Sequence, residues 1–161
     1  MAASVLDTPI GPLGLVASDR GLRSVLFDGA RLRPEGTSRV LDNAAWQLGA
    51  YFCGDLIEFD LPLDLDGTDF QRQCWLALAT ILYGQTVSYG EQARRIGLGS
   101  DRARAVGAAN GQNPLPIVLP CHRVIGADGS LTGFGGGLAV KRALLELEGA
   151  DCVCDLFSRA S

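Results

Sequence analysis

The spacing of apolar residues changes near residue 67, and this change restricts the chain to two unlike parts. In the first part, short apolar and β-branched runs at 4–7, 13–17 and 22–27 are separated by turns that contain Gly, Pro or Asp. Runs of this length, broken by such residues, are typical of strands joined by tight turns. The pattern predicts a small antiparallel β-sheet at the start of the chain.

A helix and an extended segment complete the first part. Apolar residues recur at helical spacing over 40–52 and stop before Gly54, which predicts one helix. Residues 28–38 are predicted to form a polar loop. Residues 59–66 are predicted to be an extended surface linker, because Pro62 and three acids are unsuited to a central strand. We therefore predict that residues 1–66 form an α/β domain.

Capping residues mark the helices of the second part. A Thr or Ser followed three positions later by Gln or Glu satisfies the free N–H groups at a helix start. This pattern predicts a helix at 69–82, opened by Thr68 and Gln71, and a short helix from Ser88, with Glu91, to about Gly97. Further helices are predicted at about 100–109, capped by Ser100 and Asp101, and at 138–147. The two middle helices suggest a helix-turn-helix within a mainly α-helical domain of residues 67–161.

Composition excludes several classes of protein. The chain is 47% hydrophobic and 20% charged, as in a globular protein. No signal peptide is recognisable, and no apolar run approaches the roughly 20 residues that span a bilayer. Five cysteines without regular spacing suit a reducing compartment better than a disulfide framework. We expect a cytoplasmic protein without a membrane partner.

Charge is divided unevenly along the chain. The net charge of −4 argues against a nucleic-acid partner, but residues 71–125 hold six arginines against Glu91 and Asp101, a local excess of +4. Phosphates respond to the local surface, because charges beyond about 10 Å are screened at ordinary salt. The excess permits DNA binding, and a solvated helix face explains it equally well on charge alone.

The strongest chemical signal is a cysteine beside the single histidine. Cys121 and His122 follow a short apolar run at 117–119, after an extended, proline-containing segment at 113–116. A thiol needs a base, a cation or a helix dipole to become a nucleophile at neutral pH. Because neighbouring side chains of an extended chain point apart, His122 requires a turn or a bridging water to reach the thiol. On these residues alone, a buried structural cysteine is the simpler interpretation.

Two further features remain ambiguous on position alone. Glu148 lies in the last turn of the predicted C-terminal helix, where the helix dipole disfavours an anion. On position alone an exposed residue is the simpler interpretation, and a group that orients an imidazole is the alternative. Small residues surround Arg102 and Arg104 over 103–111. They allow the helix to approach closely either a neighbouring helix or a narrow groove.

Together these motifs resemble the O6-alkylguanine-DNA alkyltransferases, also called methylated-DNA–protein-cysteine methyltransferases. The most specific match is Pro120-Cys121-His122-Arg123-Val124. The similarity extends upstream through Ser88-Tyr89-Gly90-Glu91 and Ala103-Arg104-Ala105-Val106-Gly107, and downstream through Gly133-Phe134-Gly135-Gly136-Gly137 and Leu144-Leu145-Glu146-Leu147-Glu148. Weaker similarity reaches Thr8-Pro9-Ile10-Gly11, so the resemblance covers nearly the whole chain.

The resemblance implies a fold and a way of binding DNA. The N-terminal domain would be ribonuclease-H-like, and the C-terminal domain would carry a winged-helix-like helix-turn-helix that docks in the minor groove of double-stranded DNA. The damaged guanine would be flipped into a pocket, Arg104 would fill the vacated space, and Tyr89 would help to turn the nucleotide outward. The implied DNA-binding residues are Ser88, Tyr89, Arg102, Arg104, Ala105 and Asn110.

The resemblance also implies the chemistry. Cys121 would take the alkyl group from O6-alkylguanine, with O4-alkylthymine as a further candidate, and the protein would be spent after one turnover. His122, oriented by Glu148, would remove the thiol proton through a water, while Tyr89 would donate to the departing base and Asn113 would tie the helix-turn-helix to the nucleophile. The implied pocket residues are Val124, Leu131, Phe134, Gly135 and Gly136. No cofactor or metal is expected, and the protein is expected to be monomeric, with cooperative assembly on DNA left open.

One departure and three rival readings accompany the resemblance. Many members carry Tyr where this chain has Phe134, so we expect a change in the range of alkyl groups accepted. A non-catalytic lesion-binding protein is disfavoured because such proteins lack the cysteine. A Cys–His hydrolase would need an oxyanion hole for which the sequence gives no sign, and a plain helix-turn-helix regulator leaves the second-half motifs unexplained. Cys152 and Cys154 are interpreted as a feature of the tail.

Overall fold

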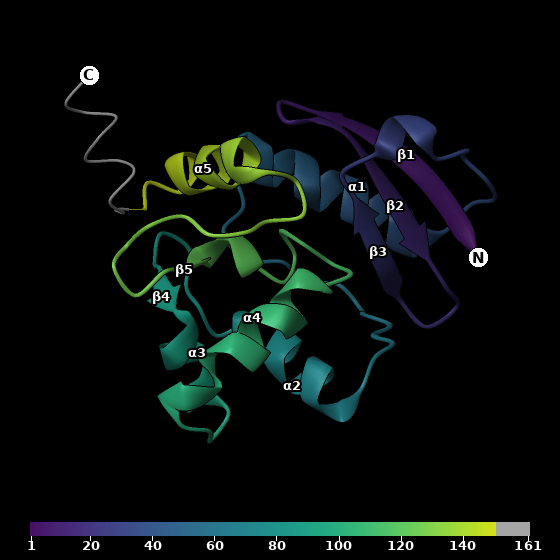
Figure 1. Cartoon of the computed structure of the whole chain (residues 1–161). Coiled ribbons are helices and arrows are strands. Elements are labelled where there is room, and N and C mark those ends of the chain that lie inside the picture. Colours follow the sequence, from purple (N-terminus) through teal and green to yellow (C-terminus); the bar gives the residue numbers. More distant parts are fainter. Residues whose placement is uncertain (151–161) are drawn as a thin grey trace. The chain divides into compact units, whose positions relative to one another are not determined.

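The computed structural model of the chain describes residues 1–150 and contains two compact units, one of residues 1–66 and one that begins at Gly67. Each unit has its own secondary structure, and each is described separately (Figure 1). The first combines a small antiparallel sheet with one long helix, and the second is mainly helical. This is the division into an α/β part and an α-helical part that the spacing of apolar residues predicts.

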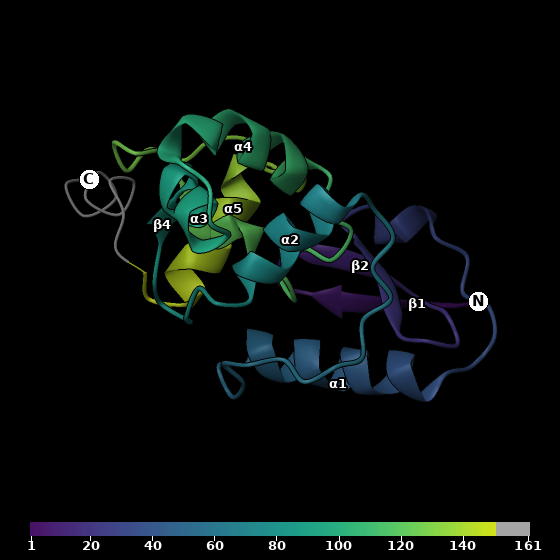
Figure 2. The ribbon, with the colours of Figure 1, turned by 90° about the horizontal axis from the view of Figure 1, so that it is seen from below.

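The first unit is a meander of three strands with a helix on one face. Strands β1 (Ala2–Thr8), β2 (Gly11–Ala17) and β3 (Leu22–Leu26) pair antiparallel in the order β1-β2-β3. Helix α1 (Arg39–Phe52) lies along one face of this sheet, as the two views together show (Figures 1 and 2). The core between them is apolar, with fully buried side chains from β2 and α1: Leu13, Leu15, Ala44, Leu48 and Tyr51.

Local signals explain where these elements begin and end. The Ser38 hydroxyl accepts hydrogen bonds from the backbone N–H groups of Val40 and Leu41, so α1 starts with a satisfied end. Beyond α1, Gly54 has a φ of 80°, a left-handed conformation that suits glycine. The predicted loop at 28–38 contains one 3₁₀ turn, η1 (Gly29–Arg31).

The prediction of a surface linker at 59–66 is wrong in part. Leu63 forms a parallel bridge with Leu22 at the edge of the sheet, where Leu22 N–H donates to Pro62 O at 2.8 Å and Asp64 N–H donates to Leu22 O at 2.9 Å. Pro62 is tolerated because an edge position uses its carbonyl and not the N–H that it lacks. The segment therefore extends the edge of the sheet for a short distance.

The second unit contains four α-helices, two 3₁₀ turns and a two-stranded parallel pairing among its described residues. The helices are α2 (Asp69–Leu78), α3 (Tyr89–Arg95), α4 (Ala103–Gly111) and α5 (Leu138–Leu147). Strand β4 (Val87–Ser88) pairs with β5 (Val124–Ile125). The turns are η2 (Ser100–Arg102), which leads into α4, and η3 (Cys121–Arg123), which leads into β5.

Helices α2, α3 and α4 share a compact core. It is formed by small and medium side chains, Cys74, Ala93, Val106 and Ala109, all at most 4% exposed. The indole N–H of Trp75 on α2 donates to the carbonyl of Ala109 on α4 at 2.8 Å. The small residues of 103–111 are thus used, at least in part, for close packing between helices.

The caps of the second unit agree only partly with the predictions. Thr68 and Gln71 form the complete capping box of α2, but that helix ends at Leu78 and not near 82. Ser88 accepts from Glu91 N–H, which is one half of the second predicted box. The predicted cap at Ser100 and Asp101 is wrong, because a 3₁₀ turn precedes α4 and no side chain caps either element.

Two expectations about apolar segments also need correction. Residues 114–119 form bends and turns and not an extended chain, and Ile117 has a φ of 75°, the one non-glycine residue with positive φ among residues 1–150. Leu138, expected to anchor the C-terminal helix, is 49% exposed, whereas Leu144 and Leu145 are fully buried.

Candidate active site

The nucleophile candidate lies on a tight turn. Cys121, His122 and Arg123 form η3, in which Cys121 is partly exposed while the other two side chains are buried. The backbone here is therefore a turn and not the extended chain in which neighbouring side chains point to opposite faces. Cys121 and His122 therefore occupy one short structural element at the start of β5.

Asn113 shapes the loop that carries this turn. Its Oδ1 accepts from Leu115 N–H at 2.9 Å, and its Nδ2 donates to Leu119 O at 2.8 Å, so one side chain closes the loop from 113 to 119. The Asn113 side chain also hydrogen-bonds Cys121. The contact favours the thiolate form of the cysteine.

The buried carboxylate of Glu148 contacts both residues that follow Cys121, His122 and Arg123. Glu148 Oε2 lies 2.7 Å from His122 Nε2, and the Arg123 guanidinium donates to Glu148 through Nε at 2.8 Å and Nη2 at 3.0 Å. The side chains of His122 and Glu148 are fully buried. The simpler interpretation of Glu148 as an exposed residue is therefore wrong: the helix end is placed where its carboxylate meets the η3 turn.

These contacts define the tautomer of His122. Burial lowers the pKa of His122, and although Glu148 acts in the opposite direction, the net shift is downward. The imidazole is thus neutral at pH 7, and Nε2–H donates to the Glu148 carboxylate. Nδ1 is then the proton acceptor, and this buried atom has no protein partner among residues 1–150.

The surroundings of Cys121 disfavour its thiolate form. Burial raises the pKa of Cys121, while the hydrogen bond from Asn113 and the positive charge of Lys141 lower it. Because burial prevails, the thiol is protonated at neutral pH and needs a base to become a nucleophile. The neutral imidazole next to it in sequence offers one.

Lys141 is a functional candidate that was not predicted from the sequence. It is fully buried on α5, and its Nζ donates to Val124 O at 2.7 Å and to Thr132 O at 2.9 Å. Burial lowers its pKa from 10.5 to about 8, and Cys121 partly offsets this effect. A lysine inside an otherwise apolar helix face was the available signal, since buried lysines usually have a partner.

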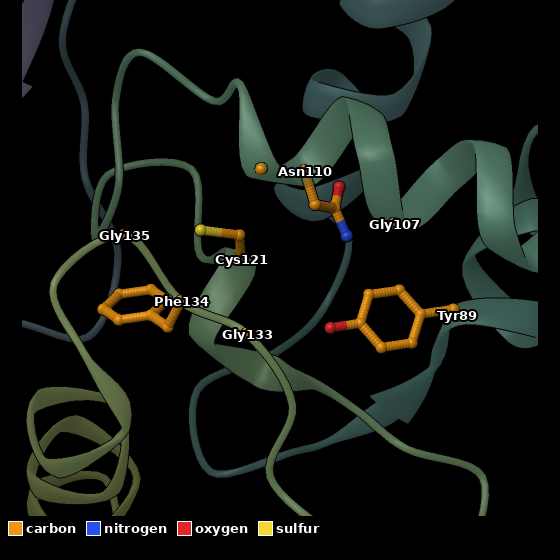
Figure 3. Close-up of a pocket in the computed structure, with 8 residues that line it drawn as sticks. Tyr89, Gly107, Asn110, Cys121, Gly133, Phe134 and Gly135 are labelled. Atoms are coloured by element: carbon orange, nitrogen blue, oxygen red, sulfur yellow. The ribbon is translucent and has the colours of Figure 1, made fainter.

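A pocket opens beside Cys121. It has a volume of about 360 Å³ and is lined by Tyr89, Gly107, Asn110, Gly111, Cys121, Gly133, Phe134 and Gly135. Figure 3 shows Tyr89 on one side, Phe134 on another and Cys121 between them, with the Tyr89 hydroxyl directed inward. The α4 side of the pocket has two glycines, which leave room for a planar ligand.

Tyr89 is held at the pocket by a second hydroxyl. Its Oη lies 2.7 Å from Thr132 Oγ1, and its ring lies over Gly107 of α4. Burial raises the pKa of Tyr89, so the phenol is protonated at neutral pH and is available as a donor.

The remaining predicted pocket residues lie elsewhere. Val124, Leu131 and Gly136 are not among the residues that line the cavity. Val124 is fully buried in β5 opposite Val87, and Leu131 packs against the cluster of Ile125, Leu145 and Ala150. Two of these three residues therefore belong to the core next to the pocket and not to its wall.

The predicted DNA-binding residues have different environments. Arg102 and Arg104 are exposed on η2 and α4, and the Arg102 guanidinium lies 5.8 Å from the centre of the Phe70 ring. Ala105 is half-buried, and the Ser88 hydroxyl caps α3.

Asn110 has a distinct environment in the core between two helices. It exchanges two hydrogen bonds with Gln92, at 2.9 and 2.7 Å, while Gln92 also donates to Cys74 O at 3.0 Å. Asn110 is only 9% exposed yet lines the pocket. Gln92 was not predicted to be important, because its hydrogen-bond partners Cys74 and Asn110 lie far from it in the sequence.

Within residues 1–150, no group of three or more His, Cys, Asp or Glu side chains is arranged to hold a metal ion. Over the same residues, no helix has both the length and the apolar character that crossing a membrane requires. Cys152 and Cys154 lie outside the described residues.

Comparison with known proteins gives matches to both parts of the chain. Residues 69–150 match the model of the 6-O-methylguanine DNA methyltransferase DNA-binding domain, and residues 1–65 match the ribonuclease-like domain of the same family. This chain belongs to the 6-O-methylguanine DNA methyltransferase family.

Individual members of the family are similar over nearly their whole length. The methylated-DNA–protein-cysteine methyltransferase of Mycobacterium tuberculosis H37Rv is 52% identical over 156 residues, which are 94% of each chain. The crystal structure of M. tuberculosis O6-methylguanine methyltransferase superposes with a TM-score of 0.83 at 48% identity and covers 97% of this chain and 98% of that one. The same mycobacterial protein has been crystallised in complex with DNA, with a TM-score of 0.78, 52% identity and coverage of 90% and 91%.

Proposed function

We infer that this protein repairs alkylated DNA by moving the alkyl group from O6-alkylguanine to its own Cys121, as a methylated-DNA–protein-cysteine methyltransferase. The observation that carries this conclusion is the joint position of a partly exposed cysteine, a buried neutral histidine with an unpartnered Nδ1, and a pocket that contains the cysteine. The family membership supplies the reaction class. A thioether has no ready hydrolysis route, so each molecule acts once.

We propose the following path for atoms and electrons. His122 Nδ1 accepts the thiol proton through a bridging water, and Glu148 keeps Nε2 protonated so that Nδ1 stays available. The Cys121 sulfur attacks the alkyl carbon, the S–C bond forms and the C–O bond breaks. The electron pair stays on the guanine oxygen, where the Tyr89 hydroxyl stabilises the negative charge, and guanine finally takes up one proton. Asn113 holds the nucleophile loop in place.

We propose that α3 and α4 act as a helix-turn-helix on the minor groove of double-stranded DNA. Exposed Arg102 and Arg104 supply positive charge beside the pocket-lining residues of α4. In this proposal Arg104 fills the space of the flipped nucleotide and Tyr89 meets the base, with Ser88 and Ala105 near the backbone. The buried Asn110 contributes to the pocket wall and not to the groove contact. The first unit is taken to be ribonuclease-like, and the protein is proposed to act as a monomer in the cytoplasm, bound to the nucleoid.

Mass spectrometry after incubation with duplex DNA that contains O6-methylguanine tests this function directly. One methyl group should appear on the peptide that contains Cys121, and Cys121→Ser should bind the lesion without transfer. Lesion binding by the unaltered protein without any added mass would instead identify a non-catalytic lesion-binding protein. Methylation at Cys53 or Cys74 in place of Cys121 would contradict the assignment of the nucleophile.

A further inference from the structure

Thr132 is a polar residue next to the pocket, in contact with the lining residue Tyr89, and the reaction described above gives it no role. It belongs to the loop that precedes Gly133, Phe134 and Gly135, and its hydroxyl lies 2.7 Å from the Tyr89 hydroxyl. No other hydrogen bond of the Thr132 hydroxyl is found among residues 1–150. The pair therefore consists of two hydroxyls that satisfy each other at the edge of the pocket.

The backbone of Thr132 is fixed from the other side. Its carbonyl accepts a hydrogen bond from the buried ammonium of Lys141 at 2.9 Å, and the same ammonium donates to Val124 O at 2.7 Å, directly after the nucleophile turn. Thr132 is thus tied to the segment that carries Cys121 through its carbonyl and to Tyr89 through its hydroxyl. This double attachment sets the distance between the pocket wall and the phenol.

The number of hydroxyl hydrogens decides which of the two residues donates in the Tyr89–Thr132 hydrogen bond. Tyr89 has one hydroxyl hydrogen, and its pKa is raised by burial, so the phenol retains it at neutral pH. When that hydrogen is donated to an acceptor on a bound base, the bond to Thr132 can persist only if Thr132 donates to the Tyr89 oxygen. A hydroxyl that accepts a hydrogen bond becomes a better donor, because chains of hydrogen bonds polarise one another.

We propose that Thr132 is a positioning residue for the transfer reaction, whose hydroxyl donates to Tyr89 and strengthens the hydrogen bond from Tyr89 to the departing guanine. The inference rests on the proposed function, since it concerns the group that receives the electron pair when the C–O bond breaks. It adds a two-step donor chain, from Thr132 to Tyr89 to the base, on the side of the leaving group. The proton on Tyr89 stays on Tyr89 throughout, so the balance of the reaction is unchanged.

A double-mutant cycle in the full-length protein tests this inference. The measurement is the single-turnover rate of Cys121 methylation by duplex DNA containing O6-methylguanine, for the unaltered protein, Thr132→Val, Tyr89→Phe and the double variant. Val replaces the hydroxyl with a methyl of similar size and leaves the Thr132 carbonyl available to Lys141. We expect Thr132→Val to slow transfer about fivefold, of the order of one neutral hydrogen bond, and to have no effect in the Tyr89→Phe background.

Two controls separate positioning from packing. Thr132→Ser retains the hydroxyl and should recover at least half of the unaltered rate. Ser130→Ala, in the same loop but with its hydroxyl bonded to Asp128 and not to Tyr89, should leave the rate unchanged. Thermal unfolding of each variant identifies any loss caused by a misfolded loop, and Thr132→Ser remains informative if Thr132→Val fails to fold.

The outcomes distinguish this inference from the proposed function. An equal effect of Thr132→Val with Tyr89 and with Phe at position 89, or an unchanged rate with Tyr89, would overturn the role of Thr132 while methylation of Cys121 still proceeds. Absence of methylation in the unaltered protein would remove the proposed function itself.

Discussion

At the scale of single residues, the site works by keeping most of its charges buried and paired. Glu148 is shared between the neutral His122 and the cationic Arg123, all three side chains being at most 8% exposed. Lys141 is buried, has no carboxylate partner among residues 1–150 and donates to two backbone carbonyls. Such groups are expensive to bury, and perturbed groups at a pocket are typical of functional sites. Substitution of Glu148 and of Lys141 tests these two features.

Glu148→Gln should damage both stability and transfer. The change leaves the buried Arg123 guanidinium without its counter-charge, so we expect a loss of about 3–5 kcal/mol in the free energy of unfolding. Urea unfolding measures this loss. Single-turnover methylation of Cys121 should slow by at least tenfold, because the carboxylate that holds the His122 imidazole in its Nε2–H tautomer is lost. Glu146→Gln, on an exposed neighbour in the same helix, serves as the control and should match the unaltered protein. Similar behaviour of the two variants would contradict the role of Glu148.

Lys141→Met should change how stability depends on pH. The pKa of Lys141 is about 8 in the folded protein against 10.5 as its ordinary value, so between these pH values the unfolded state binds more protons and stability increases with pH. Below pH 8 both states are charged and the burial of the ammonium is fully unfavourable. The unaltered protein should therefore gain up to about 3 kcal/mol relative to Lys141→Met between pH 7 and 10.5. Urea unfolding across this range measures the gain, and Arg142→Met, which changes the adjacent exposed cation and keeps Lys141, should show the same pH dependence as the unaltered protein. Parallel curves for the unaltered protein and Lys141→Met would contradict the shift.

At the scale of elements, α2, α3 and α4 are joined by polar contacts inside an apolar core. The amides of Gln92 on α3 and Asn110 on α4 exchange two hydrogen bonds, and Gln92 also donates to Cys74 O on α2. The orientation of the Gln92 amide is fixed, because the Cys74 carbonyl can only accept. One glutamine therefore links all three helices through its side-chain hydrogen bonds.

Gln92→Ala should destabilise the second unit. The substitution leaves the Asn110 amide without its partner in a buried position, removes one donor to Cys74 O and opens a cavity, so we expect a loss of about 2–4 kcal/mol in the free energy of unfolding. Chemical denaturation followed by tryptophan fluorescence in a Trp46→Phe background, where Trp75 is the remaining tryptophan, reports on the loss. Gln112→Ala, at the exposed C-cap of α4, is the matched control and should stay within about 0.5 kcal/mol of the unaltered protein.

At the scale of the whole molecule, charge is separated between the two units. Residues 1–66 contain ten acids and five bases, and residues 67–150 contain six acids and eight bases. The chain therefore has a negative net charge although its second unit is basic and has exposed arginines on η2 and α4. A DNA partner would respond to the second unit, because distant charges are screened at physiological salt.

Arg104→Ala should weaken binding to duplex DNA and flatten its dependence on salt. The slope of log K against log salt should decrease by about 1 if Arg104 neutralises one phosphate, and transfer from duplex DNA should fall much more than transfer from the free base. Fluorescence anisotropy at several salt concentrations measures the slope. Arg33→Ala, an exposed arginine of the first unit, should leave it unchanged. Equal losses of transfer from duplex DNA and from free base would argue against a role of Arg104 in flipping.

Local patterns predicted most of the elements, and long-range contacts account for what they missed. Thr68 and Ser88 mark helix starts, and the Pro- and Gly-containing turns mark the strands, because caps and turns depend on a few neighbouring residues. The edge pairing of Leu63 with Leu22 and the burial of Glu148 depend on residues far away in the sequence, 41 and 26 positions apart. Lys141 was missed for the same reason, since its two carbonyl partners lie in other segments. Cys121 and His122 were identified because they are adjacent.

The left-handed Ile117 has a consequence for protein engineering. A β-branched residue with a φ of 75° is strained, and at 1% exposure it is held there by the surrounding core. Transplanting the Cys-His-Arg tripeptide alone onto another scaffold would lose this support and give a relaxed chain with an ordinary thiol. A successful graft would have to begin at Asn113 and bring the packing around Ile117 with it.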